Sequence, residues 1–145
     1  MADISKNTFV IKGLLVSGVP TINSNVYTDD CLLSVMNQII NSQVKVTVQE
    51  MNVPERERDG IPAYEPIKSR TMAIILGATV INGSLDVVCE TRSTRDGKKL
   101  TGMLNTIGIE LLEFVPVGFG KTRINGKLNE VYDYILKYVS VDPIT

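Results

Sequence analysis

The 145-residue sequence contains no histidine, and this absence removes whole classes of chemistry. Histidine is the usual base that activates a serine or cysteine nucleophile, and it is the commonest metal ligand in proteins. Ser-His and Cys-His mechanisms and histidine-ligated metal sites are therefore excluded. Two cysteines without histidine also fall short of an ordinary structural zinc site. We expect neither a metal nor a bound cofactor.

Composition sets further limits on the class of protein. No apolar run reaches the roughly 20 residues that span a bilayer, and the opening MADISKNTF lacks the apolar core of a signal peptide. The net charge of −1 comes from scattered residues rather than from a basic footprint. We therefore expect one domain over residues 1–145 that binds neither membranes nor nucleic acid. Cys31 and Cys89 lie in apolar patterns that indicate buried free thiols, and a disulfide stays open as the alternative.

Hydrophobic spacing predicts several strands and two short helices. Residues Thr8–Val16 are apolar and β-branched, which favours a strand, and a second strand is predicted where Val44, Val46 and Val48 alternate with polar residues. Residues Asp29–Asn41 have helical spacing, with Thr28 as the predicted N-cap.

A second helix is predicted over residues 98–107, because its apolar residues share one face and Gly108 stands where a C-terminal cap is wanted. Asn-Gly pairs at residues 82–83 and 125–126 indicate tight turns between strands. The first joins residues 71–81 to 84–90, and the second lies between residues 110–117 and 130–139.

The last of these strands carries an aromatic stripe that favours core packing, with a ligand platform as the alternative; the stripe consists of Tyr132, Tyr134, Leu136 and Tyr138. Taken together, the elements predict a mainly β (α+β) fold. We expect an antiparallel β-barrel of six to seven strands, closed or nearly closed, with two short flanking helices.

Residues 50–68 differ from the rest of the chain. They contain three prolines, a run of mixed charges and little periodicity, and loops of this length in a compact domain are often functional or disordered. Two interpretations stay open: a solvated excursion, or an arm that contacts a partner. The candidate contact residues of such an arm are Pro54, Glu55, Arg56, Glu57, Arg58 and Tyr64.

The sequence Gly120-Lys121-Thr122 has the ending of a phosphate-binding P-loop, but the spacing is wrong. The first glycine of that motif would fall at Val115, and the neighbouring Pro116 has no N–H to donate. A helix should follow the motif, whereas an Asn-Gly turn comes next. We therefore expect no nucleotide site here.

Three stretches in a fixed order carry a resemblance to a known family. TINSNVYTDDCLL keeps Asn23 and Tyr27 of a pattern close to Asn-x-Asn-Gly-Arg-x-Tyr that precedes a helix. DGKKLTGMLNTIGIELLEFVPVGFG has the layout of a helix that opens with Gly-Lys and closes on Gly before a strand, and ILKYVSVDP ends in a Val-Ser-Asp-Pro-like close. The chain thereby resembles the prohead (capsid maturation) proteases of contractile-tailed phages, which share a barrel fold with the herpesvirus assemblins.

The resemblance implies that the protease activity has been lost. In active members the nucleophile strand reads Val-Ser-Ser-Arg-Gly-Leu-Gly, and aligning its glycines with residues 118–120 puts Val115 and Pro116 at the two serines. The segment that supplies the histidine would fall near residues 52–54. Because nucleophile and base are both missing, we expect no serine protease activity.

Two other catalytic arrangements have little support in the sequence. A Ser-Lys dyad would need Ser69, Ser84 or Ser93, which lie in predicted turns or loops with no lysine tied to them by spacing. The acidic pairs within residues 29–30 and 55–57 have the character of a helix start and of solvated charges.

A barrel that has lost catalysis but keeps the apolar pattern of its core indicates a protein that is retained for binding. The resemblance implies a non-catalytic bacteriophage structural protein, a capsid-associated auxiliary or decoration protein, located in the virion after assembly in the host cytoplasm. Its expected partners are the major capsid protein or other virion proteins, and a homo-oligomer is open. The alternatives are an internal scaffold or core component of the prohead, and an enzyme of unrelated chemistry.

Overall fold

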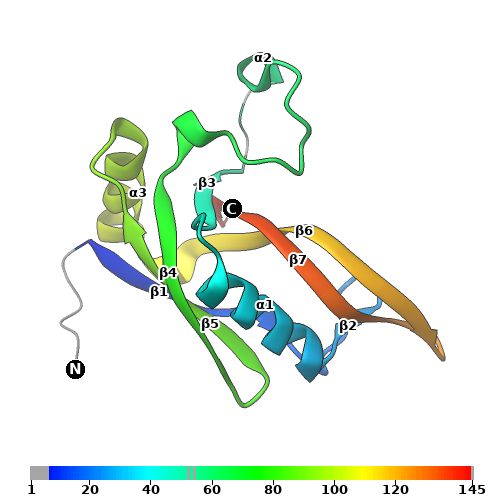
Figure 1. Cartoon of the computed structure of the whole chain (residues 1–145). Helices are drawn as coiled ribbons and strands as arrows, with labels where there is room; N and C mark the ends of the chain where they lie inside the picture. The colour runs from blue at the N-terminus through cyan, green and yellow to red at the C-terminus, as the bar shows by residue number, and fades with distance from the viewer. Residues whose placement is uncertain (1–6, 52, 54, 145) are drawn as a thin grey trace.

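The computed structural model describes residues 7–51, 53 and 55–144, which form a curled sheet flanked by helices (Figure 1). Among the helices of these residues, none is long and apolar enough to cross a membrane. The strands are β1 (Thr8–Val16), β2 (Asn25–Tyr27), β3 (Thr47–Glu50), β4 (Ala73–Ile81), β5 (Ser84–Thr91), β6 (Leu112–Asn125) and β7 (Leu128–Pro143). The helices are α1 (Asp29–Asn41), α2 (Glu55–Arg58) and α3 (Arg95–Thr106), with short 3₁₀ turns at Lys68–Arg70 and Ile109–Leu111.

The sheet is mixed, so the prediction of an antiparallel barrel is only partly right. Strands run in the order β1-β5-β4-β3-β7-β2, and β6 pairs with β7. The β1–β5, β4–β5, β3–β4 and β6–β7 pairs are antiparallel, but β2 and β3 both pair with β7 in parallel. Helix α1 joins β2 to β3 and works as the crossover that parallel strands require.

The curl brings the two ends of the sheet together without closing it. Phe9 of β1 and Phe114 of β6 have ring centroids 5.9 Å apart. Within the described residues, however, no ladder of hydrogen bonds joins these two strands. The architecture is therefore a half-barrel rather than a closed barrel.

Helix α1 has the predicted bounds and the predicted N-cap: the Cys31 N–H donates to Thr28 Oγ1 at 3.0 Å. Its buried face packs into the core that the curled sheet encloses. The Gln38 side chain also completes the edge of β7 between β2 and β3. Its Nε2 donates to the Leu136 carbonyl at 2.8 Å, and its Oε1 accepts from the Leu136 N–H at 3.0 Å. A single amide thereby replaces a missing strand and leaves no peptide group of Leu136 unpaired.

Helix α3 begins three residues earlier than predicted, at Arg95, with Thr94 as its N-cap. The prediction started late because Gly97 lowers helix propensity in the first turn. Its role is steric: a Cβ at Gly97 would lie 1.9 Å from the Arg92 carbonyl oxygen. The glycine after the helix, Gly108, has the positive φ of 94° that the sequence indicated.

Strand bounds differ from the prediction where tertiary contacts decide them. The valine strand begins only at Thr47, and Val44 is 75% exposed. Strands β6 and β7 extend well beyond the predicted segments and meet at the expected Asn125-Gly126 turn. Register shifts at Tyr132 and Lys137 in β7 place Tyr132 and Tyr138 on the outer face, so only Tyr134 and Leu136 of the predicted stripe belong to the core.

Candidate functional site

The strand that aligns with the protease nucleophile strand is β6, and its two faces have different surroundings. Gly118 and Gly120 face the core, since a Cβ on either would lie within 3.4 Å of the buried Tyr134 ring. Because side chains alternate along a strand, Val115 and Phe119 lie on the outer face. By the resemblance, a nucleophile at position 115 would be displayed on this outer face of β6 and β7.

The loop between β3 and β4, which rises above the sheet in Figure 1, is fastened to this outer face. Arg58 Nη1 donates to the carbonyls of Pro62 (2.8 Å) and Glu65 (3.2 Å). Its Nη2 donates to Tyr138 Oη at 3.3 Å, and the Tyr138 hydroxyl donates to the Ala63 carbonyl at 2.7 Å. Arg58 thus folds the loop on itself and attaches it to β7.

Two further contacts hold the loop near its end. The Tyr64 ring packs edge-on against Phe119 of β6, with centroids 4.8 Å apart. The Ile67 N–H donates to Oε1 of Gln49 at 2.8 Å, and both residues are buried. The segment is therefore attached to the sheet at Arg58, Tyr64 and Ile67 through contacts that are distant in sequence. Most of its residues from 56 to 64 are nevertheless exposed, so the interpretation as a solvated excursion is right only for the stretches between these contacts.

A serine does lie beside the aligned nucleophile position, but its surroundings are those of a structural residue. Ser140 of β7 is the register partner of Val115, and its Oγ donates to the Val115 carbonyl at 3.3 Å. The side chain is buried, and on its other side the register partner is Gln49 of β3. A backbone carbonyl cannot take the hydroxyl proton, so this bond does not activate Ser140 as a nucleophile.

Within the described residues, none of the three serines considered for a Ser-Lys dyad is hydrogen-bonded to a lysine side chain. Ser69 is in the 3₁₀ turn before β4, and Ser84 Oγ donates to Asp86 Oδ1 at 2.8 Å. Ser93 lies in the turn before α3 and lines a hollow of about 510 Å³ together with Lys98. Within the described residues no hydrogen bond joins Ser93 to that lysine.

The six predicted contact residues do not form one surface. Pro54 and the side chain of Glu55 lie outside the described part of the chain. Arg58 and Tyr64 are directed at the sheet, whereas Arg56 is exposed. A role of this segment in partner binding stays a prediction.

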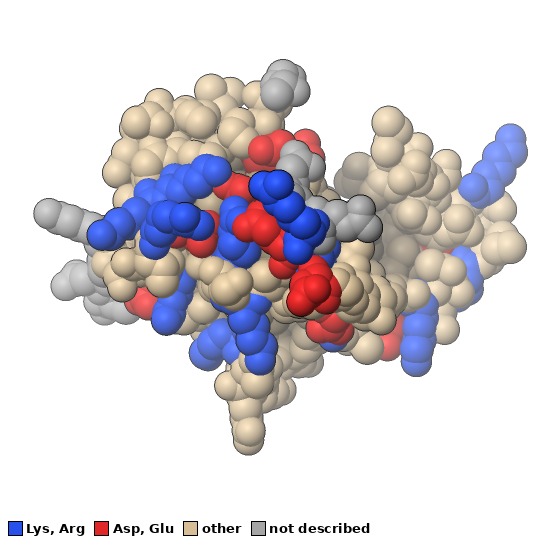
Figure 2. Space-filling model, turned by 90° about the horizontal axis from the view of Figure 1, so that it is seen from above, with Lys and Arg blue, Asp and Glu red and all other residues tan. Residues whose placement is uncertain are grey.

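The remaining member, Glu57, belongs to a cluster of charges around Arg70. The guanidinium pairs with Glu57 at 2.7 Å, Glu50 at 3.2 Å and Asp96 at 3.3 Å, and Lys99 pairs with Glu50 as well. Burial alone would lower the pKa of Arg70, but the three carboxylates outweigh it and raise the pKa. Figure 2 shows acidic and basic side chains interleaved on this face. The cluster joins β3, α2 and α3, so part of the loop's charge is already compensated within the chain.

The two cysteines are free and buried, which confirms the first interpretation of them. Burial, with a smaller effect of Asp133, raises the pKa of the Cys31 thiol to about 11. Burial raises the pKa of the Cys89 thiol to about 12. Both therefore stay protonated at neutral pH and are poor nucleophiles.

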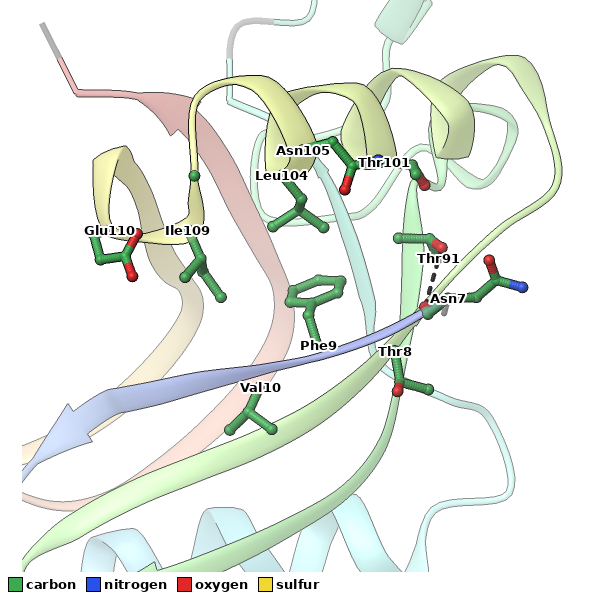
Figure 3. A pocket seen from close by; sticks show the side chains of 11 residues that line it. Asn7, Thr8, Phe9, Val10, Thr91, Thr101, Leu104, Asn105, Ile109 and Glu110 are labelled. Carbon is green, nitrogen blue, oxygen red and sulfur yellow. Dashed lines mark hydrogen bonds between the residues drawn. The ribbon is translucent and has the colours of Figure 1, made fainter. Parts of the chain in front are cut away.

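Another cavity, of about 480 Å³, lies between the start of β1 and the end of α3 (Figure 3). Phe9, Leu104 and Ile109 form its apolar part, and the Thr91 hydroxyl donates to the Asn7 carbonyl at its rim. Among the described residues that line it, Glu110 is the single carboxylate and none is basic. This cavity therefore contains no pair of groups for acid–base or nucleophilic chemistry.

The Gly-Lys-Thr sequence lies within β6, which runs on to Asn125 instead of leading into a helix. Lys121 is the register partner of Asp133, on the exposed end of the β6–β7 hairpin. The phosphate-binding geometry of a P-loop needs a helix N-terminus at this point, and the chain has a strand there.

One backbone detail matches the family pattern that TINSNVYTDDCLL resembles. Ser24 has φ of 61°, a conformation that favours glycine, and the family pattern has a glycine at this place. The serine is held by its N–H, which donates to the Thr21 carbonyl at 2.9 Å.

No protein-family profile and no curated protein matches the sequence. Among solved structures, the chain is similar to the capsid assembly protease of bacteriophage T4, with a TM-score of 0.69 and 20% sequence identity. The alignment covers 94% of this chain and 81% of the T4 protein. At this level of identity the likeness establishes the fold, which is that of the prohead proteases.

Proposed function

We propose that the chain is a non-catalytic structural protein of a bacteriophage that binds to the capsid as an auxiliary or decoration protein. The observation that carries the proposal is the state of the nucleophile strand. Val115 and Pro116 occupy the aligned serine positions, and the whole sequence lacks histidine. The neighbouring Ser140 hydroxyl is bonded to a backbone carbonyl. The outer face of β6 thus supports binding better than proteolysis.

The capsid role rests on the fold. The similar structure belongs to a protein whose name is capsid assembly protease, and the present chain has its fold without the usual catalytic groups. Function does not follow from fold alone, so the capsid is the partner that this analogy favours and that experiment must test. A barrel retained after the loss of catalysis is expected to keep its contacts with the particle, the major capsid protein above all.

The absence of protease activity can be tested directly. We expect no serine to react with a fluorophosphonate probe, because no base is available to take the hydroxyl proton. We also expect no cleavage of capsid or scaffold proteins. An active serine hydrolase in the same reaction serves as the positive control. Labelling of Ser140 or another single serine that is lost on heat denaturation would contradict the proposal.

Particle composition tests the capsid role. We expect purified mature particles to contain the chain in a fixed ratio to the major capsid protein. Its presence only in immature particles would instead assign it to the internal scaffold, and its absence from both would contradict a structural role. Replacing residues 53–64 with a short Gly-Ser linker should abolish occupancy. That variant should still fold, because the replaced contacts lie on the outer face rather than in the core. The lost contacts are the Arg58 and Ala63 bonds to Tyr138, the Tyr64–Phe119 ring contact and the Glu57–Arg70 pair, each of which contributes about 1 kcal/mol or less.

A further inference from the structure

Four exposed apolar side chains, from four segments distant in sequence, form a continuous surface. Phe119 and Ile135 are register partners on β6 and β7, and the Tyr64 ring packs against Phe119. Ile135 and Val44 line the same hollow of about 290 Å³, between the start of β3, the end of the β3–β4 loop and β7. The exposed fractions are 75% for Val44, 53% for Ile135, 49% for Phe119 and 42% for Tyr64. Aromatic and aliphatic side chains grouped in this way are typical of the centre of a protein interface.

The rim of the hollow is positively charged, although the chain as a whole is nearly neutral. Lys45, Lys68 and Lys137 line it. Among the described lining residues the single acidic one is Glu65, which is already paired with Lys137 at 2.9 Å. Within the described residues, Lys45 and Lys68 are exposed and form no ion pair. Two uncompensated positive charges therefore stand beside the apolar side chains, which favours a partner of negative charge.

The hollow is small, and Thr47 at the start of β3 is one of the residues that line it. Its volume is at the lower end of the range for ligand pockets, and a hollow of this volume suits one side chain rather than a whole small molecule.

We propose that this surface, formed by Val44, Tyr64, Phe119 and Ile135 with Lys45, Lys68 and Lys137, binds an acidic segment of another protein. One large apolar side chain of that segment enters the hollow between Val44 and Ile135, and carboxylates beside it pair with Lys45 and Lys68. The inference rests on the proposed function only in that the chain acts by binding. It names the chemistry of the partner and leaves open which virion protein supplies it.

A random library of 12-residue peptides, displayed on yeast and selected against the purified chain, tests the proposal without particles. We expect the enriched peptides to be acidic and to share a Phe, Leu, Ile or Met.

Variants of the surface test the same proposal by fluorescence anisotropy. Ile135→Ser and the double variant Lys45→Glu/Lys68→Glu should each weaken binding of the best peptide by about tenfold or more. Ile81→Ser and Lys127→Glu are matched controls, because neither residue lines the hollow. Ile81 is a similarly exposed strand isoleucine (58%), and Lys127 is an exposed lysine in the turn of the β6–β7 hairpin. Both controls should bind as the wild type does.

Several results would overturn the proposal. These are no enrichment, enrichment of neutral or basic peptides, or equal binding by Ile135→Ser. Circular dichroism verifies that each variant is folded. If Ile135→Ser does not fold, the double variant Lys45→Glu/Lys68→Glu still tests the proposal. Sedimentation velocity of the wild type gives another contrary outcome: a self-association that Ile135→Ser abolishes would assign the surface to a second copy of the chain. Failure of the chain to enter particles would count against the proposed function, but not against binding of acidic peptides.

Discussion

Gly118→Ala is expected to lower the free energy of unfolding by about 3 kcal/mol, a large effect for a single methyl group. A Cβ at Gly118 would lie 2.0 Å from the Ile135 carbonyl oxygen, which is a backbone atom of the neighbouring strand. A side chain could rotate away, but this oxygen can move only if β6 and β7 separate locally. The strain therefore falls on the longest strand pair of the sheet.

Gly77→Ala is the matched control, because Gly77 also lies in a strand and a Cβ there would meet nothing within 4 Å. Its expected effect is within about 0.5 kcal/mol of zero. Urea unfolding measures both variants, with equal m-values indicating that the denatured state is unchanged. If Gly118→Ala unfolds at the same urea concentration as the wild type, the close approach of β6 and β7 is not as described.

This result would also explain the Gly-Phe-Gly sequence in physical terms. Gly118 and Gly120 both face Tyr134 of the core, and at Gly118 the partner backbone leaves no room for a side chain. The glycines that the resemblance aligns with those of the protease strand then have a role in packing. This role does not depend on the chemistry of the neighbouring residues.

Local signals in the sequence predicted the local structure well. The bounds of β1 and α1 were predicted correctly because each depends on a contiguous run, and α1 has a capping threonine at its start. Both Asn-Gly turns form, and Asn82 and Gly83 have the positive φ values that such hairpin turns require. These features need no information from distant parts of the chain.

Non-local pairing accounts for what the sequence did not predict. Strand β2 has only three residues and is stabilised by pairing with β7, so no run of apolar residues identifies it. The parallel pairing of β2 with β7, and of β3 with β7, depends on where α1 returns the chain. Hydrophobic spacing carries no information about that position. The outer face is assembled in the same way: Arg58 reaches Tyr138 across 80 positions of sequence. The sequence allowed the candidate contact residues to be named. It did not show which of them contact the sheet, which belong to the Arg70 cluster and which are exposed.

The cluster around Arg70 leads to the second large expected effect. The Arg70 side chain is 15% exposed, and two of its partners, Asp96 and Glu50, are 10% and 19% exposed. Removing the guanidinium leaves Asp96 without its ion-pair partner and leaves Glu50 paired with Lys99 only, in a partly desolvated place. The third partner, Glu57, is 39% exposed, so its pair adds little. We expect Arg70→Met to cost about 3 kcal/mol of stability.

The matched control and a double variant separate the ion pairs from the loss of side-chain packing. Arg95→Met removes an exposed arginine that has no ion pair within the described residues, and should change stability by less than about 0.5 kcal/mol. Arg70→Met/Asp96→Asn should be more stable than the sum of the two single variants predicts, by about 1 kcal/mol, because the second change removes a charge that the first left uncompensated. Urea unfolding gives these values.

Arg70→Met should also loosen the β3–β4 loop before the whole chain unfolds. Glu57 of α2 is tied to the body of the protein through Arg70. Without this pair, α2 itself is held only through Arg58 among the described contacts, while Tyr64, Glu65 and Ile67 hold the end of the loop. Limited proteolysis under native conditions should then cut faster within residues 53–66 than elsewhere, whereas Arg95→Met should be cut like the wild type. Raised salt should narrow the difference between Arg70→Met and the wild type only slightly, because partly buried pairs are weakly screened. If Arg70→Met costs less than about 1 kcal/mol and the loop is cut no faster, the cluster does not fasten α2 to the sheet, and Arg58 and Tyr64 hold the loop on the outer face without it.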